Sequence, residues 1–261
     1  MAIPILLLTQ NHFAFPSQKF NFQFEQTDDS AKAGRYDMPD DSKMRDSETI
    51  ITIKKTNDFQ FSGDGSAENW RNTSWINIPK RTSSIPAYQT KVKLLYSETG
   101  IYVLFFCEDK KLTATMDKDF LDLWNEDVVE IFLQPDGGNP TYLEYEISPL
   151  NYELPIIIYN EKGKLNSWQP FHYENDRKTR HATTVQGGEK KSNGQVKSWT
   201  AEIFIPFNLM KPVLDKVPTS GTNWKGNIFR VDYDEEATEW SWQLTGSSFH
   251  EYEKFGSFHF E

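Results

Sequence analysis

The stretch LDLWNEDVVEIFLQP, residues 121–135, runs from a polar, acidic bend into a run of valine, isoleucine, phenylalanine and leucine. Short runs of β-branched and aromatic residues bounded by turn residues are typical of β-strands. The segment DGGNP, residues 136–140, is strong turn chemistry and closes this strand. Trp124 stands just before the strand and Glu130 lies inside it, so a large ring and a charge need an explanation beyond strand formation.

Strand patterns continue on both sides of this stretch. Upstream, KVKLLYS and IYVLFFCE are separated by a short turn that contains Gly100, which predicts a β-hairpin. Downstream, TYLEYEISP has period two and predicts a half-buried strand. Its faces would carry Tyr142, Glu144 and Glu146 on one side and Leu143, Tyr145 and Ile147 on the other.

About ten such strands and no convincing helical pattern predict an all-β fold, a two-sheet antiparallel β-sandwich of the jelly-roll type. We expect residues 48–261 to form this single domain, and residues 1–47 to be an atypical or disordered N-terminal extension, because that segment is polar and acidic without periodicity. Strand context assigns five aromatic residues to the core: Tyr142, Tyr145, Trp199, Trp240 and Trp242.

The amino-acid composition argues against some kinds of binding partner. The net charge is −10 and the lysines and arginines are dispersed, which argues against a nucleic-acid partner. No segment approaches the roughly 20 apolar residues of a membrane span. The single cysteine, Cys107, forms no intrachain disulfide and is expected to be a small buried hydrophobe. Eight tryptophans and 15% aromatic residues suit either a sandwich core or a stacking surface.

The N-terminal segment MAIPILLLTQNHFAF is only weakly similar to a secretory signal, because it lacks a basic start and a clear cleavage site. Met44 stands just before the patterned sequence begins. A second interpretation is therefore that residues 1–43 are an upstream extension and that the protein begins near Met44, in which case it would be cytoplasmic.

Motifs for nucleotide, zinc and serine-hydrolase chemistry are absent from the sequence. Acidic pairs are present: Glu144 with Glu146, and the set Glu126, Asp127 and Glu130. Two carboxyls in a cleft could serve glycoside hydrolysis, whereas a solvated face or a cation site is the commoner role of such pairs. The segment FSGDGSAENW, residues 61–70, is rich in oxygen ligands for calcium, but its spacing favours a tight turn before a core tryptophan.

Taken in order, the segments FSGDG…W, LWNEDVVEIFLQP, YLEYEISPLNYEL, WTAEIFIPF, NIFRVDY and FHEYEKFGSFHF resemble the family 9 carbohydrate-binding modules over residues 50–261. The resemblance implies a β-sandwich that binds an oligosaccharide or polysaccharide between two aromatic rings without catalysis, as an accessory to glycan breakdown. It also implies export to the periplasm or the medium. Structural calcium is compatible with the family, the resemblance implies no other cofactor, and we expect a monomer.

The same resemblance assigns roles to individual residues. Trp124 takes the place of one stacking ring, a flat apolar platform for the C–H face of a sugar. Glu130 takes the place of a hydroxyl acceptor, and Asp127 would orient the bend. Phe249 aligns with the second ring, and His250 beside it would donate a hydrogen bond.

The sequence departs from the family at other positions of this set. Glu146 stands where family members have an arginine, and Gly246 where they have an asparagine. Arg230 would be a replacement donor, although an arginine in a strand more often pairs with an acid such as Asp232 or Glu202.

Two other function classes stay open from the sequence. One is a glycan-processing enzyme of the O-glycosyl hydrolase type, or an accessory subunit of one, that uses Glu130 or Glu146 with a second acid. The other is a haem-binding sandwich, for which Met116 and His172 would be the axial ligands.

Overall fold

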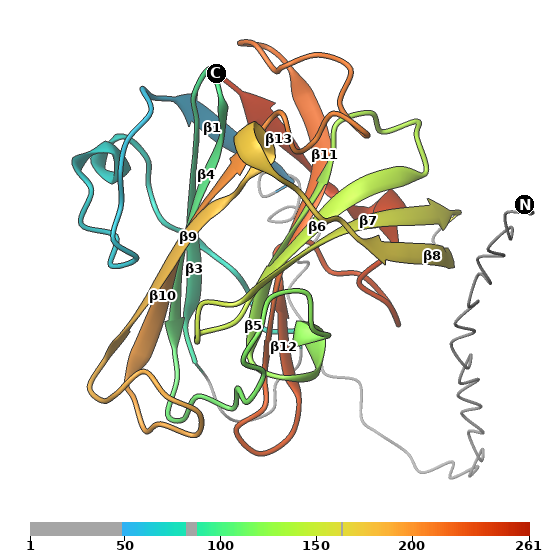
Figure 1. Cartoon of the computed structure of the whole chain (residues 1–261). Helices are drawn as coiled ribbons and strands as arrows, with labels where there is room; N and C mark the ends of the chain where they lie inside the picture. The colour runs from blue at the N-terminus through green and yellow to red at the C-terminus, as the bar shows by residue number, and fades with distance from the viewer. Residues whose placement is uncertain (1–48, 82–87, 163) are drawn as a thin grey trace, which may run out of the picture. The chain divides into compact units, whose positions relative to one another are not determined.

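The computed structural model describes residues 49–81, 88–162 and 164–261 (Figure 1), so the expected extension, residues 1–47, lies outside the described residues. In the part described, no helix is long and apolar enough to cross a membrane.

The described chain contains strands β1 (Ile50–Lys55), β2 (Ile76–Asn77), β3 (Thr90–Tyr96), β4 (Gly100–Glu108), β5 (Val128–Gln134), β6 (Thr141–Ile147), β7 (Glu153–Glu161), β8 (Lys164–Pro170), β9 (Arg180–Gln186), β10 (Ser198–Pro206), β11 (Asn223–Asp232), β12 (Thr238–Ser241) and β13 (Gly256–Phe260). Four short 3₁₀ helices accompany them: η1 (Glu68–Asn72), η2 (Leu123–Asn125), η3 (Asn175–Arg177) and η4 (Tyr252–Lys254).

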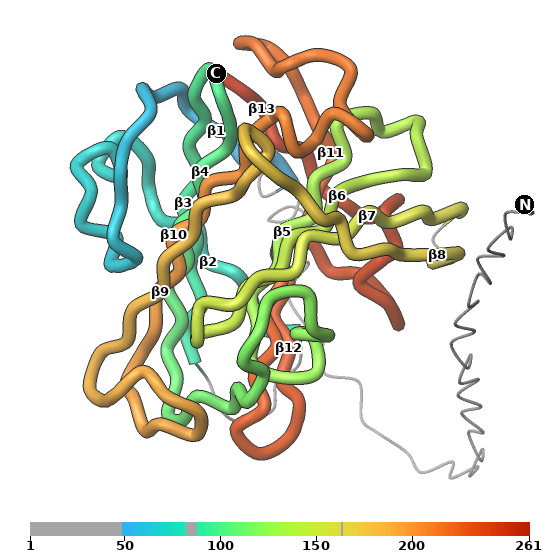
Figure 2. Tube along the Cα trace, in the orientation of Figure 1, coloured from blue at the N-terminus to red at the C-terminus, as the bar shows by residue number. Residues whose placement is uncertain are grey.

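The strands form one curled sheet in the order β8-β7-β6-β5-β11-β13-β1-β3-β4-β10-β9, with β12 beside β11 and β2 beside β3. In Figures 1 and 2 the arm that contains β3, β4, β9 and β10 lies to the left, and β6, β7 and β8 lie to the right. The prediction of an all-β fold is confirmed. The expected hairpin is also confirmed, since β3 and β4 pair in antiparallel register across the turn before Gly100.

Strand β1 joins the two arms. Its first residues, Ile50–Ile53, pair in parallel with β13, and Lys54 and Lys55 then pair in parallel with β3. A purely antiparallel arrangement is therefore not confirmed, because the described sheet is mixed. The ladder hydrogen bonds of one strand thus hold both arms together.

One apolar core fills the space between the arms. Strands β3, β4 and β10 contribute Val92, Phe105 and Ile203, and strands β5, β6 and β11 contribute Ile131, Tyr145 and Ile228 to the same cluster. Cys107 and the five expected core aromatics, Tyr142, Tyr145, Trp199, Trp240 and Trp242, are all buried. Burial raises the pKa of the Cys107 thiol to about 12, as expected for an inert core residue.

A second apolar cluster lies on the opposite face of β5, β6, β7 and β11. Alternation along each strand sends Val129, Ile131 and Leu133 to the central core, whereas Val128 and Phe132 join the second cluster. Both faces of β6 are covered as well, so the expected half-buried strand is buried on both sides. Glu144 and Glu146 therefore lie inside the protein and not on a solvated face.

The FSGDG segment forms a tight turn that closes on β10. The backbone N–H of Gly63 donates to Glu202 Oε2 at 2.6 Å, and the indole N–H of Trp70 donates to Glu202 Oε1 at 2.6 Å. Gly63 has φ +90, and a Cβ there would lie 2.7 Å from the carbonyl carbon of Ala182. Asp64 accepts hydrogen bonds from Ser62 and Ser66 within the turn. The turn before a core tryptophan, favoured by its sequence, is confirmed.

Candidate functional site

A cavity of about 400 Å³ opens on the second apolar cluster, on the face of the sheet that points away from the central core. Strands β5 to β8, the end of β11, β12, helix η2 and the loop before η4 all contribute to it. We call it the site cavity; it is lined by Trp124, Glu130, Phe132, Glu144, Ile156, Ile158, Leu165, Trp168, Val231, Tyr233, Glu239, Ser247, Phe249 and His250. Four of the six residues that the sequence analysis selected, Trp124, Glu130, Phe249 and His250, are therefore brought together here.

Trp124 is held at the rim by the backbone around it. Leu123, its neighbour in η2, is fully buried in the second cluster. The hydroxyl of Tyr233 donates to the Trp124 carbonyl at 2.8 Å. Asp127 accepts the backbone N–H groups of Thr113 at 2.6 Å and Tyr233 at 2.8 Å, which ties the bend to two other segments. The main chain thus holds residue 124 in place, and the indole ring of Trp124 is available at the cavity.

Trp168 contacts Trp124 at the cavity, and the sequence analysis did not select it. The two ring centroids are 5.1 Å apart with an angle of 81° between the planes, an edge-to-face arrangement. Trp168 lies on β8, a strand with hardly any buried residue, and 42% of its surface is exposed. An indole that keeps 42% of its surface exposed beside a cavity offers an apolar face to a ligand.

Phe249 is less open than a free stacking ring. It stacks on Phe229 with centroids 4.1 Å apart and an interplanar angle of 6°, and the Arg81 guanidinium lies 5.0 Å from its ring centre. Arg81 itself is held by an ion pair with Glu239 at 2.9 Å and by a hydrogen bond to the Gly246 carbonyl at 2.7 Å. Gly246 thus contributes a carbonyl where an asparagine side chain was expected from the family.

His250 connects the loop before η4 to strands β6 and β7. Its Nδ1 lies 2.8 Å from the Tyr142 hydroxyl, and its carbonyl accepts a hydrogen bond from Asn160 at 2.5 Å. The imidazole also stacks on Phe132 at 5.4 Å. Burial lowers the pKa of His250 to about 4, so the ring is neutral at neutral pH. A neutral ring with one nitrogen already engaged has its other nitrogen left for a ligand.

Two glutamates form the floor of the cavity and a third lies behind them; we call Glu130, Glu144 and Glu146 the carboxyl cluster. Glu130 on β5 lies directly opposite Glu146 on β6, and Glu144 precedes it by two residues on the same face. Glu130 and Glu144 line the cavity, whereas Glu146 lies behind them with no exposed surface. The structure thus brings Glu146 beside the predicted site without exposing it.

Burial decides the protonation of this cluster. It raises the pKa of Glu144 to about 8, and with the negative charges of neighbouring carboxyls it raises the pKa of Glu130 and Glu146 well above the ordinary range. A glycosidase needs one protonated acid and one ionised carboxylate. All three members of the cluster are shifted in the same direction, so nothing in the described cluster separates these two roles. Glu126, the other acid considered, accepts the backbone N–H groups of Thr115 and Met116 and is a turn residue.

Arg230 does not reach the cavity. Alternation along β11 sends its neighbours Phe229 and Val231 to the second cluster and turns Arg230 to the opposite face, where it is fully buried. There its guanidinium pairs with Asp232 at 2.5 Å and Asp109 at 3.2 Å. The role of a donor to a sugar is therefore replaced by a structural ion pair, and the expected pairing with Asp232 is confirmed.

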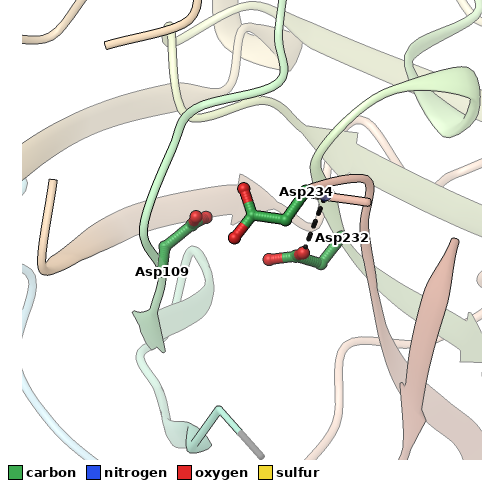
Figure 3. A group of neighbouring side chains, drawn as sticks. All are labelled: Asp109, Asp232 and Asp234. Carbon is green, nitrogen blue, oxygen red and sulfur yellow. Dashed lines mark hydrogen bonds between the residues drawn. The ribbon is translucent and has the colours of Figure 1, made fainter. Parts of the chain in front are cut away.

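A group of acids around this arginine has the composition of a metal site. Ligand atoms of Asp109, Asp232 and Asp234 lie within 4.8 Å of one another (Figure 3), and the backbone N–H of Asp234 donates to Asp232. However, the Arg230 guanidinium already supplies a positive charge to two of the three carboxyls. The hydroxyl of Tyr88 donates to Asp234 at 2.6 Å. These contacts support an internal ion-pair network and do not favour calcium there.

The residues considered as haem ligands do not meet at the site cavity. Met116 packs against the second cluster, and His172 stacks on Phe120 with centroids 4.1 Å apart. Neither lines the cavity. The described geometry therefore gives no support to the haem hypothesis.

Comparison with known families gives one match that covers most of the chain. The model described as "Carbohydrate family 9 binding domain-like" matches residues 62–261. An extracellular protein of Arthroderma benhamiae is 27% identical over 153 residues, which are 56% of this chain and 64% of that protein. The chain thus spans less than two thirds of the length of that relative.

Solved structures support the fold. A protein from Bacteroides uniformis superposes with a TM-score of 0.66 at 15% identity, over 81% of this chain and 99% of that one. A family 9 carbohydrate-binding module from Caldicellulosiruptor kristjanssonii, solved in complex with cellotriose, superposes with a TM-score of 0.56 at 17% identity, over 81% and 93%. Its complex with glucose gives a TM-score of 0.55 at 17% identity, over 81% and 96%.

Proposed function

The chain belongs to the carbohydrate family 9 binding domain-like family, and from this premise we propose that its site cavity binds a sugar unit without transforming it. The observation that carries the proposal is the combination of the Trp124 and Trp168 rings at the rim with carboxyl groups at the floor. Indole rings stack on the apolar face of a sugar, and carboxyl groups exchange hydrogen bonds with its hydroxyls. The ligand class is an oligosaccharide or the end of a polysaccharide.

Trp124 and Trp168, whose rings are in edge-to-face contact, take the part of the aromatic platform on which a sugar stacks, and Phe249 adds a third ring to the lining. This differs from the pair Trp124 and Phe249 expected from the sequence, because Phe249 is already stacked on Phe229 and lies next to Arg81. Glu130 and His250 supply polar contacts from the floor and the loop. Affinity is modest, because a few stacking and hydroxyl contacts must offset the ordering of the ligand.

Several wider features belong to the same proposal. The two arms of the curled sheet act as the layers of a jelly-roll sandwich, supported by the single core to which both contribute. The protein works as a monomer outside the cytoplasm, as an accessory to glycan breakdown, and does not bind nucleic acid. The dispersed positive charges and the net charge of −10 support the last point.

Calorimetric titration with neutral mono- and oligosaccharides, including reduced-end forms, tests the proposal. We expect wild type to bind at least one sugar with a dissociation constant between micromolar and millimolar. Trp124→Ala should lose that binding while remaining folded, because the contacts that hold this segment are made by its main chain. Absence of binding by wild type across a broad panel, with near-UV circular dichroism showing an ordered protein, would refute it.

A further inference from the structure

The carboxyl cluster lacks positive partners. Glu130 and Glu144 are 2% and 5% exposed and line the cavity, and Glu146 behind them is 0% exposed. Glu144 Oε2 and both oxygens of Glu146 receive no hydrogen bond from any donor of the described chain, and a proton on one of these two carboxyls is shared only with the other. Buried carboxyls are normally paired or fully hydrogen-bonded, because taking a charge out of water is costly. Unpaired carboxyl oxygens at the floor of an open cavity therefore point to a ligand that supplies the missing charge or donors.

The basic groups nearest to the cluster are already used or neutral. His250 Nδ1 is 4.0 Å from Glu144 Oε2, but burial lowers the pKa of this imidazole and the same nitrogen lies 2.8 Å from the Tyr142 hydroxyl. Arg81 is paired with Glu239, the remaining acid of the lining. The described lining contains neither lysine nor arginine. A cation that enters the cavity meets carboxyls that no side chain of the lining neutralises.

We propose, resting on the function proposed above, that the preferred ligand is an amine-bearing sugar whose ammonium group sits against Glu130 and Glu144 while its ring contacts the aromatic walls. Trp124, Trp168 and Tyr233 add to the attraction, because aromatic faces stabilise a nearby cation. A neutral sugar offers hydroxyl groups only, which bind a protonated carboxyl but give no charge partner to a carboxylate. Selectivity for the amine over the hydroxyl follows from this difference.

A metal ion is a weaker occupant of the same floor. Among the described residues, the acids whose ligand atoms lie within 4.8 Å of one another are Asp109, Asp232 and Asp234, and the carboxyl cluster does not meet this condition. Ca²⁺ requires six to eight oxygens at about 2.3–2.6 Å, a closer gathering than these strands provide. An ammonium group needs only two or three acceptors at hydrogen-bond distance.

Binding of the amine is coupled to a proton. Glu144 is protonated at neutral pH before a ligand binds, because burial raises its pKa to about 8, and burial shifts the pKa of Glu130 and Glu146 in the same direction. When the ammonium enters, one carboxylic acid ionises, and its proton leaves to solvent as the carboxylate pairs with the ligand. The other titratable groups that face the cluster are Glu239, Tyr142, Tyr233, His250 and Asp122. Amine binding therefore releases a proton, whereas binding of a neutral sugar releases none.

The test is calorimetry at pH 6.5 with three trimers of the same linkage: β-1,4-linked glucosamine, its N-acetylated form and cellotriose. We expect the glucosamine trimer to bind at least tenfold more tightly than cellotriose, with an apparent enthalpy that changes with the ionisation enthalpy of the buffer. Glu144→Gln keeps the shape but removes the acid, and it should reduce the preference for the amine to less than threefold.

Each other outcome has a clear meaning. If cellotriose or the acetylated trimer binds wild type as tightly as the amine, this inference is wrong and the proposed function stands. If no trimer or other sugar binds, the proposed function fails and this inference fails with it. If the preference persists in Glu144→Gln, it reflects attraction to the net charge of −10 and not the cluster. If CaCl₂ titration shows a site that Glu144→Gln removes, a metal occupies the floor and the inference is overturned.

Discussion

Trp168 leaves 42% of its surface exposed although its ring meets Trp124 edge to face. If the two indoles hold a sugar, Trp168→Ala should weaken binding by about 1 kcal/mol, roughly five- to tenfold, because one stacking face is lost. Stability should change little, because an exposed side chain contributes little to the core. Calorimetric titration together with thermal unfolding measures both effects.

Trp75 provides a matched control for that substitution. It is 41% exposed, lies edge to face with Phe106 at 6.3 Å, and is not part of the site cavity. Trp75→Ala should therefore leave sugar affinity within about twofold of wild type. Equal losses in the two variants would mean that the binding surface is not the cavity, and the assignment of Trp168 would be withdrawn.

Trp124 and Glu130 stand out in the sequence because a large ring precedes an apolar strand and a charge lies inside it, but their roles in sugar binding came from the family resemblance. Phe249 and His250 were reached only through the family resemblance, because they lie in an irregular loop. Trp168 was missed because its strand is exposed and polar, so no periodicity selects it. For Arg230 the sequence left a sugar donor and an ion pair both open, because alternation gives two faces of a strand but does not say which face meets the cavity.

At the scale of elements, the turn around Gly63 connects the start of the domain to β10 through Glu202. A Cβ at residue 63 would lie 2.7 Å from the Ala182 carbonyl carbon and 2.8 Å from its oxygen. Gly63→Ala should therefore move the turn away from β9 and weaken both hydrogen bonds to Glu202. We expect a loss of several kcal/mol in the free energy of unfolding, measured by urea titration.

Substitution of Gly221 is a control that separates the steric clash of a new Cβ from the strain of a left-handed backbone. It has φ +88, close to that of Gly63, but a Cβ there would have nothing within 4 Å. Gly221→Ala should thus cost only about 1–2 kcal/mol, the strain of a left-handed residue. If both variants lose the same stability, the close approach to Ala182 does not matter and the account of this turn is incorrect.

Local patterns predicted ten of the thirteen described strands. The three others are β2, β8 and β9: β2 has two residues, and β8 and β9 are polar sequences that pair at the ends of the sheet. The parallel pairing of β1 was also out of reach, because its partners β13 and β3 lie far along the chain and no turn sets their register. Hairpins were predictable for the opposite reason, since a short turn sets the pairing of its own flanks.

At the scale of the whole molecule, acids are buried in two separate regions. The carboxyl cluster lies at the site cavity, and Asp109, Asp127 and Asp232 surround Arg230 on the opposite face of β5 and β11. Burial raises the pKa of Glu144 and Asp127 to about 8 and that of Asp109 to about 7. In the unfolded chain these carboxyls titrate near pH 4. The native protein therefore holds protons that the unfolded chain has released.

Stability should consequently fall as pH rises through the range from 6.5 to 8.5. A group whose pKa is raised by folding stabilises the native state below its unfolded value, and this contribution is lost as pH passes the folded value. Each native proton still bound gives a slope of about 1.4 kcal/mol per pH unit. His250, whose pKa is lowered to about 4, acts in the opposite direction only below about pH 6.5, which is why the range starts there.

Urea unfolding at pH 6.5, 7.5 and 8.5 in 0.5 M salt measures the slope, since salt screens surface repulsion but not buried groups. Glu144→Gln should make the slope shallower. A free energy of unfolding that stays constant or rises over this range would show that the buried acids are ionised in the folded protein, and the proton release expected on amine binding would lose its basis.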